Sequence, residues 1–132
     1  MSTEATASVS THILDTGTGR PAAGVAVSLS ARSGPGAEWT RLGGFTTDAD
    51  GRCRDLPVLP EGTTGVRLVF GTEEYFLTRR AEARQDASAN RDGGDGPVFF
   101  PEVAVAFAVV PGEHYHVPLL LNPFGYSVYR GS

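Results

Sequence analysis

The stretch that decides the fold is His114–Ser132, HYHVPLLLNPFGYSVYRGS, at the end of the 132-residue chain. It reads as two strands around the turn Asn122–Gly125, NPFG, because apolar and polar residues alternate on either side of a Pro/Gly pair. In the first strand one face carries Tyr115, Val117, Leu119 and Leu121, and the other carries His114, His116, Pro118 and Leu120. The first set predicts a core face, and the second set predicts two imidazoles on the outer face of a sheet.

The rest of the chain repeats this alternation in short segments separated by Gly-, Pro- and Asp-rich turns. The expected strands lie within Val9–Leu14, Val25–Leu29, Trp39–Thr47, Arg52–Leu56, Val66–Phe70 and Val103–Val109. The turn Asp48–Gly51 is expected to close a hairpin between two of them. With the C-terminal pair, the pattern predicts an all-β, two-sheet β-sandwich of about seven or eight strands.

Two segments depart from the strand pattern. Thr72–Ala87 is rich in Glu, Arg and Ala and predicts one short helix, and Gln85–Gly96 is poor in apolar residues and predicts a mobile loop. Residues 1–7 show neither the basic nor the apolar region of a signal peptide. We expect them to be a disordered N-terminal extension, followed by a single domain over residues 8–132.

Charge and cysteine content exclude several functions. The net charge is −4 and no run of Lys or Arg occurs, which argues against nucleic acid or an anionic membrane as a partner. Cys53 is the only cysteine, so no intramolecular disulfide can form. We expect a buried thiol in place of a reactive one, and a cytoplasmic location.

The candidate site lies on an outer sheet face. His12 shares a strand face with Ser10 and Leu14, opposite the more apolar face of the same strand, so it points outward like His116. Arg52 follows a turn glycine at a strand start, and Ser127 and Tyr129 share one face of the last strand. The apolar side chains expected to be exposed beside these groups are Leu14, Pro118 and Leu120. Such a mixed patch is typical of an interface with a second subunit.

Simpler interpretations compete with each of these signals. His114, next to Glu113 at a strand start, is expected to be a surface residue without a catalytic role. Asp48–Gly51 has the start of a calcium loop but lacks the later ligands, and it predicts a turn. Two histidines without a third ligand give a weak metal signal. Ser127 has no spacing to Asp and His that would predict a serine-hydrolase triad.

Four stretches together resemble a known family. They are Thr11–Asp15 with Gly19–Ala22, Thr47–Arg52, Phe99–Val103 and His114–Ser132, and they span most of the chain from about Ser8 onward. They are similar to the transthyretin-related family of 5-hydroxyisourate hydrolases. The most specific part is Tyr129–Ser132, YRGS, the tetrapeptide that ends the enzymes of this family and is absent from the hormone-carrying transthyretins.

The resemblance implies a transthyretin-like sandwich with one short helix, assembled as a homotetramer whose outer sheet faces enclose a channel. It implies hydrolysis of 5-hydroxyisourate to 2-oxo-4-hydroxy-4-carboxy-5-ureidoimidazoline in urate degradation, without a metal or organic cofactor. A transthyretin-like carrier without turnover is the alternative, and a structural or adhesive sandwich domain is a third reading. The residues that match the family's catalytic positions are His12, Arg52 and His116, and those that match its substrate-binding positions are Ser127, Tyr129, Arg130, Gly131 and Ser132.

Two positions depart from the family pattern, and the loop Gln85–Gly96 is longer than usual in the family. The family usually has Ser at position 122 and Thr at position 128, where this chain has Asn122 and Val128. Asn is a favoured turn residue, and the alternation places Val128 on the inward face. We therefore expect the site to tolerate both residues.

Overall fold

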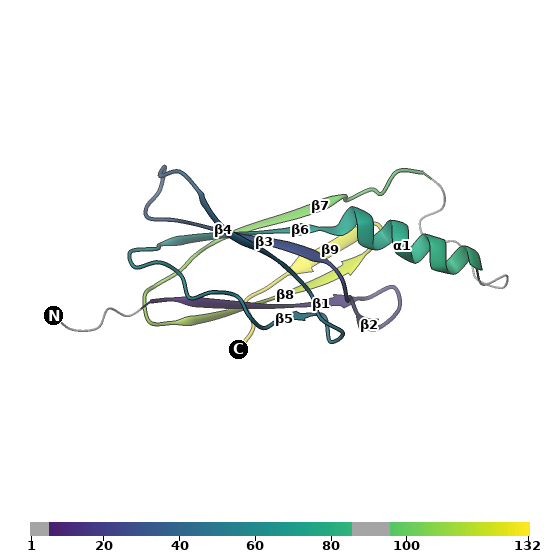
Figure 1. Ribbon diagram of the computed structural model, residues 1–132, viewed down its shortest axis with the longest axis horizontal. Coiled ribbons are helices and arrows are strands. Elements are labelled where there is room, and N and C mark those ends of the chain that lie inside the picture. Colours follow the sequence, from purple (N-terminus) through teal and green to yellow (C-terminus); the bar gives the residue numbers. More distant parts are fainter. Residues whose placement is uncertain (1–5, 86–95) are drawn as a thin grey trace.

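The protein is a sandwich of two sheets with one helix at one end of it, as Figure 1 shows. A computed structural model describes residues 6–85 and 96–132. The first sheet contains β1 (Ser8–Asp15), β2 (Arg20–Pro21), β5 (Arg52–Cys53), β8 (His114–Asn122) and β9 (Gly125–Val128). The second sheet contains β3 (Ala26–Arg32), β4 (Thr40–Thr46), β6 (Gly65–Gly71) and β7 (Glu102–Ala108). The predicted two-sheet architecture is confirmed.

The pairing of β1 with β8 organises the first sheet. The two strands run parallel, with Ser10 opposite His116 and His12 opposite Pro118. The remaining strands extend this pair, because β9 runs antiparallel to β8 while β2 and β5 both pair with β1. Residues directly opposite one another in a sheet project from the same face. The register therefore gathers the outward side chains of three strands, β1, β5 and β8, in one place.

The core lies between the sheets. Along β1 burial alternates strictly, and along β8 the predicted inward residues Tyr115, Val117, Leu119 and Leu121 are all buried. The second sheet contributes Val27, Leu29, Val66, Leu68, Phe70 and Val103, each at most 1% exposed. Burying one such side chain stabilises the fold by about 1.5–3 kcal/mol. The predicted inward and outward faces of β1 and β8 are confirmed, apart from Pro118, which belongs to the outward set and is nevertheless buried.

The predicted hairpin at Asp48–Gly51 is wrong. β4 belongs to the second sheet and β5 to the first, so the turn carries the chain from one sheet to the other. Turn residues show where the chain reverses, but they do not show which strands pair. Gly51 has a φ of 76°, and a Cβ there would lie 2.4 Å from the carbonyl oxygen of Ile13. The close approach that glycine permits here places Arg52 directly opposite His12.

The predicted helix is α1 (Thr72–Gln85), which is tied to the end of β1 through Asp15. Glu73 and Glu74 in its first turn suit the positive end of the helix dipole. Asp15 is fully buried and accepts hydrogen bonds from the Tyr75 hydroxyl at 2.7 Å and from Arg79 at 3.0 Å. This helix is too short and too polar to cross a membrane, and it is the single helix of the described segments.

Three further expectations concern chain segments and Cys53. Residues 1–5 and most of the expected loop Gln85–Gly96 lie outside the described residues. Disorder up to residue 7 is wrong for Ala7, which is 2% exposed and whose carbonyl accepts a hydrogen bond from the Leu59 amide at 3.1 Å. Cys53 is buried as expected, and desolvation, together with the charge of Asp48, raises the pKa of its thiol to about 11.

Candidate active site

His12, Arg52 and His116 meet on the outer face of the first sheet. Arg52 lies directly opposite His12 across the β1–β5 pair, and His116 lies opposite Ser10, one outward position away from His12 along β1. The three side chains are close enough that the charges of Arg52 and His12 both act on His116. All three side chains are half-buried. The structure thus brings together the three residues that the sequence analysis proposed as catalytic.

The environment of His116 favours a neutral imidazole. Its pKa is lowered first by desolvation and then by the positive charges of Arg52, His12 and His114. Histidine ordinarily titrates near pH 6.5, so a lowered pKa keeps the ring uncharged and basic at neutral pH. A neutral imidazole beside a permanent guanidinium can accept a proton while the cation attracts an anion.

A chain of hydrogen bonds runs along β1 and β8 to His116. The Ser8 hydroxyl lies 2.7 Å from Nδ1 of His114, and Nε2 of the same ring lies 2.9 Å from the hydroxyl of Ser10. The Ser10 hydroxyl also lies 2.8 Å from Nδ1 of His116. Because Nδ1 of His116 is engaged in this way, Nε2 is the nitrogen left for a substrate or a water molecule.

The C-terminal tail lies against His116. The amide of Gly131 donates a hydrogen bond of 2.7 Å to the carbonyl of His116, which forms an isolated antiparallel bridge beside β8. A Cβ at position 131 would lie 2.9 Å from Cδ2 of His116 and 3.3 Å from Cγ of Pro118. The tail accordingly accounts for the burial of Pro118, which the sequence analysis wrongly expected to be exposed, while Leu14 and Leu120 are half-buried.

The other predicted binding residues are more dispersed. Ser127 lies opposite Leu120 and is exposed on the outer face, and Tyr129 is 54% exposed. Ser132 follows Gly131 and is exposed. Arg130 is directed elsewhere, since its guanidinium lies 4.4 Å from the centre of the Tyr115 ring and 3.2 Å from a carboxylate oxygen of Glu113. The single chain therefore does not bring Arg130 to the histidines.

The two departures from the family pattern are accommodated locally. Asn122 accepts a hydrogen bond from the Phe124 amide at 2.9 Å and so stabilises the turn between β8 and β9. Val128 is half-buried and packs against the core, as the alternation predicted.

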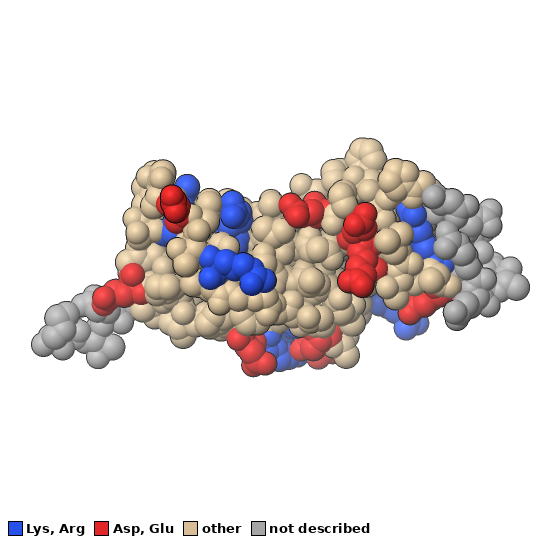
Figure 2. Space-filling model, turned by 45° about the horizontal axis from the view of Figure 1, so that its top comes forward, with Lys and Arg blue, Asp and Glu red and all other residues tan. Residues whose placement is uncertain are grey.

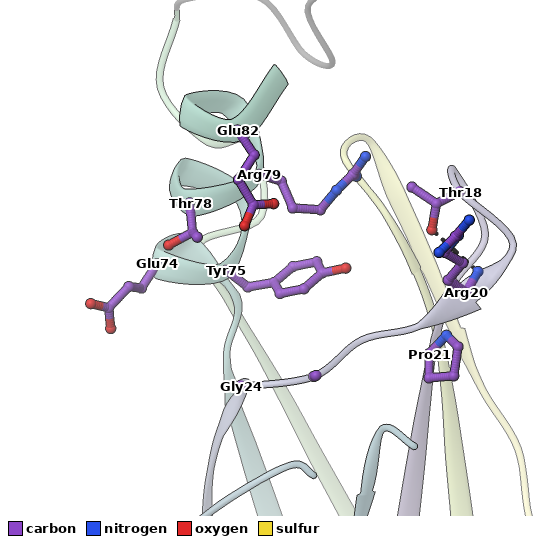
Figure 3. A pocket seen from close by; sticks show the side chains of 10 residues that line it. Thr18, Arg20, Pro21, Gly24, Glu74, Tyr75, Thr78, Arg79 and Glu82 are labelled. Atoms are coloured by element: carbon purple, nitrogen blue, oxygen red, sulfur yellow. Dashed lines mark hydrogen bonds between the residues drawn. The ribbon is translucent and has the colours of Figure 1, made fainter. Parts of the chain in front are cut away.

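A cleft of about 550 Å³ lies elsewhere, between α1 and the segment around β2 (Figure 3). Its lining residues are Thr18, Arg20, Pro21, Ala23, Gly24, Glu74, Tyr75, Thr78, Arg79 and Glu82. None of the predicted site residues is among them. Tyr75 and Arg79 already bond to Asp15, and residues of both charges line the walls. The described residues of the cleft therefore show no cluster of reactive side chains comparable to the histidine face. The histidine face is therefore the candidate site.

The sequence analysis missed the part that Ser8, Ser10 and His114 play beside the site. Their shared outward face was readable from the alternation, but their contact depends on the parallel register of β1 and β8. His114 is exposed as expected, yet both of its ring nitrogens are hydrogen bonded.

No cluster of three metal-ligating side chains occurs within residues 6–85 and 96–132. In the view of Figure 2, positive and negative side chains are interspersed over the surface.

Comparisons with known proteins identify the family. Residues 9–131 match the model of the HIUase/Transthyretin family. A protein of Salmonella typhimurium named 5-hydroxyisourate hydrolase is 40% identical over 126 residues, covering 94% of this chain and 80% of its own. The mouse (Mus musculus) protein of that name is 36% identical over 126 residues, covering 94% of each chain.

Solved structures of similar proteins indicate the same family. Klebsiella pneumoniae 5-hydroxyisourate hydrolase is 35% identical with a TM-score of 0.63, covering 94% of this chain and 98% of its own. Transthyretin from Sparus aurata is 26% identical with a TM-score of 0.72, covering 93% of this chain and 95% of its own. An (S)-allantoin synthase is 32% identical with a TM-score of 0.75, and the match covers 97% of this chain but 44% of the synthase. Since the family model matches nearly the whole chain, the protein belongs to the HIUase/Transthyretin family.

Proposed function

We propose that the protein hydrolyses 5-hydroxyisourate to 2-oxo-4-hydroxy-4-carboxy-5-ureidoimidazoline in urate degradation. The observation that carries this proposal is the convergence of His12, Arg52 and His116 on one sheet face, with the pKa of His116 lowered. The relatives named 5-hydroxyisourate hydrolase support it, because they are 36–40% identical over nearly the whole chain.

His116 acts as the general base in this proposal. A water molecule attacks the carbonyl carbon of the cyclic amide-type bond, and its proton passes to Nε2 of the neutral imidazole. The new C–O bond forms as the carbonyl oxygen gains negative charge. When the ring C–N bond breaks, the imidazolium returns the proton to the departing nitrogen, so the histidine is regenerated. The lowered pKa of His116 favours that return, since the charged ring is held in an unfavourable setting.

Arg52 and His12 are the other two catalytic residues in this proposal. The guanidinium of Arg52 meets the negative charge of the substrate and of the developing oxyanion, and it carries its charge throughout the pH range of interest. His12, directly opposite Arg52, orients the attacking water. Ser127, Tyr129, Gly131 and Ser132 border the pocket. Arg130 joins them by giving up its contacts with Glu113 and the Tyr115 ring for the substrate, and the ion pair with Glu113 is exposed and therefore weak.

A second copy of the chain covers the site in this proposal. The histidine face is an open sheet surface on which half-buried Leu14 and Leu120 lie beside polar groups. Patches of this kind are typical of subunit interfaces. A homotetramer in which paired faces enclose a channel would turn the open surface into a pocket. A reducing, cytoplasmic setting suits the single buried thiol of Cys53.

The experiment is to oxidise urate with urate oxidase and to follow the absorbance of the 5-hydroxyisourate formed, with and without the protein. Faster decay supports the enzyme. The alternative is a carrier that binds a small molecule without turnover. The similarity to transthyretin structures supports it, since one of them, from sea bream and 28% identical, is described in complex with thyroxine. Unchanged decay together with saturable ligand binding would favour the carrier and contradict the proposed hydrolysis.

A further inference from the structure

The hydroxyl of Ser10 contacts two imidazoles, those of His114 and His116. It lies 2.9 Å from Nε2 of His114 and 2.8 Å from Nδ1 of His116, and the other nitrogen of His114 lies 2.7 Å from the Ser8 hydroxyl. We propose that Ser10 is a positioning residue through which the exposed ring of His114 sets the tautomer of His116. The inference rests on the catalytic role proposed for His116.

The coupling follows from the single proton of the Ser10 hydroxyl. A hydroxyl has one proton to donate and two lone pairs to accept with, whereas each nitrogen of a neutral imidazole either donates or accepts. When Ser10 donates to Nε2 of His114, Nδ1 of His116 has to be the donor to Ser10. The proton of His116 is then on Nδ1, and Nε2 carries a free lone pair. This is the form of His116 that can take a proton from water.

Protonation of His114 reverses this arrangement. A charged imidazole donates from both nitrogens, so Ser10 must accept from Nε2 of His114. The proton of the Ser10 hydroxyl is then directed to Nδ1 of His116, which becomes an acceptor, and the neutral ring of His116 carries its proton on Nε2. Ser8 adapts in either case, because its hydroxyl can donate to or accept from Nδ1 of His114. Charging an exposed residue thus removes the basic lone pair from a half-buried one.

The groups that face the two rings differ. His114 faces Ser8 and Ser10 of β1 and lies one outward position from His116 on β8, while Glu113 beside it is engaged with Arg130 and Tyr115. Arg52 of β5 and His12 of β1 act on His116, and with burial they keep its ring neutral to lower pH. The positive charges around His116 therefore favour its neutral form, in which the proton can lie on either nitrogen.

The test is a pH titration of the resting protein by long-range ¹H–¹⁵N NMR after labelling of histidine alone. The chain has 3 histidines, so substitution of each in turn assigns the spectrum. The patterns distinguish a proton on Nδ1, a proton on Nε2 and the charged ring. Between about pH 9 and pH 5 we expect neutral His116 to change from the Nδ1–H to the Nε2–H form as His114 becomes charged.

Three variants separate positioning from general structural support. Ser10→Ala should uncouple the tautomer of His116 from the titration of His114, and Ser10→Thr, which keeps the hydroxyl, should restore the coupling. Ser28→Ala on β3 of the other sheet is the matched control and should leave all three rings unchanged. A wild-type His116 that keeps one tautomer throughout, or a Ser10→Ala protein that retains the wild-type change, overturns the proposal.

Turnover adds a second readout. With 5-hydroxyisourate, Ser10→Ala should lower kcat by about tenfold or more and Ser10→Thr by about threefold or less, because the base loses its correct tautomer in the first variant alone. The two failures can be told apart. Absence of turnover in wild type with the NMR coupling intact refutes the proposed function, whereas turnover without the coupling refutes the role of Ser10.

Discussion

The strand β1 carries two polar clusters that differ in how completely they are paired. At its end, the inward carboxylate of Asp15 accepts from the amides of Gly17 and Thr18, from the Tyr75 hydroxyl and from Arg79. On its outward face, Ser10 and His12 share the surface with His116 and Arg52, where positive charge accumulates around an imidazole.

The difference separates a structural cluster, around Asp15, from the cluster around His116 that we propose is chemical. Asp15 is 0% exposed, and each carboxylate oxygen has two donors, so its charge is balanced and its bonding capacity is used. Within the described residues, His116 is hydrogen bonded through Nδ1, and its neighbours make its protonated form unfavourable. Complete pairing fixes the helix to the sheet, whereas the incomplete pairing of His116 beside positive charges fits the role of general base that we propose for it.

The largest effect is expected from the chemical cluster. Replacing His12 or Arg52 by Ala should lower the rate of 5-hydroxyisourate hydrolysis by about 10²–10⁴-fold, since in the proposed mechanism each variant removes a group that acts in the transition state. Both side chains lie outside the core, so melting temperature and oligomeric size should stay close to wild type. Circular dichroism and size-exclusion chromatography make that check. A His12→Ala protein with the wild-type rate would place the chemistry elsewhere.

The structural cluster should show the opposite behaviour. Asp15→Ala leaves Arg79 and the Tyr75 hydroxyl without their carboxylate, and it should lower the free energy of unfolding by about 3–5 kcal/mol. Chemical denaturation measures this loss. Turnover per folded molecule should remain near wild type. The exposed pair of Asp50 with Arg54 is the control, and Asp50→Ala should barely change stability. A stable but inactive Asp15→Ala protein would contradict the division of roles.

A smaller effect on rate is expected from the tail. Gly131→Ala places a Cβ within 2.9 Å of Cδ2 of His116, so the ring or the tail must move. We expect a rate about ten- to hundredfold lower, because misplacing a reacting group by about 1 Å has effects of that size. Gly96→Ala is the matched control, since a Cβ there meets no atom within 4 Å. Equal initial rates for the two variants would mean that the tail does not position His116.

The smallest expected effect is a shift in pH dependence. Arg52 lowers the pKa of His116 by disfavouring the charged ring, after the larger effect of burial. Removing the positive charge in Arg52→Gln should therefore raise the pKa of His116, and protonation should begin at higher pH than in wild type. Histidine-selective NMR measures this in the resting protein, so loss of turnover in the variant does not matter. A pKa that falls or stays constant would refute the electrostatic role of Arg52.

Alternation along the strands predicted much of this account. It gave the inward and outward faces of β1 and β8, and so placed His12 and His116 on one surface. It could not give the pairing, because which strands meet depends on tertiary packing. For that reason the turn Asp48–Gly51 was taken for a hairpin, and the contact of Ser10 with both His114 and His116 was missed.

The C-terminal tail also shows that the sequence did not predict which residues contact one another. The family resemblance assigned Tyr129–Ser132 to the site as a unit. In the structure Gly131 lies on His116, while Arg130 lies on Tyr115 and Glu113. Where Arg130 acts depends on what covers the sheet face, and the sequence of one chain does not contain that information.

The central claim is that chemistry occurs on the histidine face of the first sheet. The most direct measurement is the initial rate of 5-hydroxyisourate decay for wild type, His116→Ala and Arg20→Ala, compared at equal protein concentration. Arg20 is an exposed cation that lines the cleft beside α1. We predict faster decay with wild type and Arg20→Ala, and a rate about 10²–10⁴-fold lower with His116→Ala. Loss of activity in Arg20→Ala with full activity in His116→Ala would contradict the account.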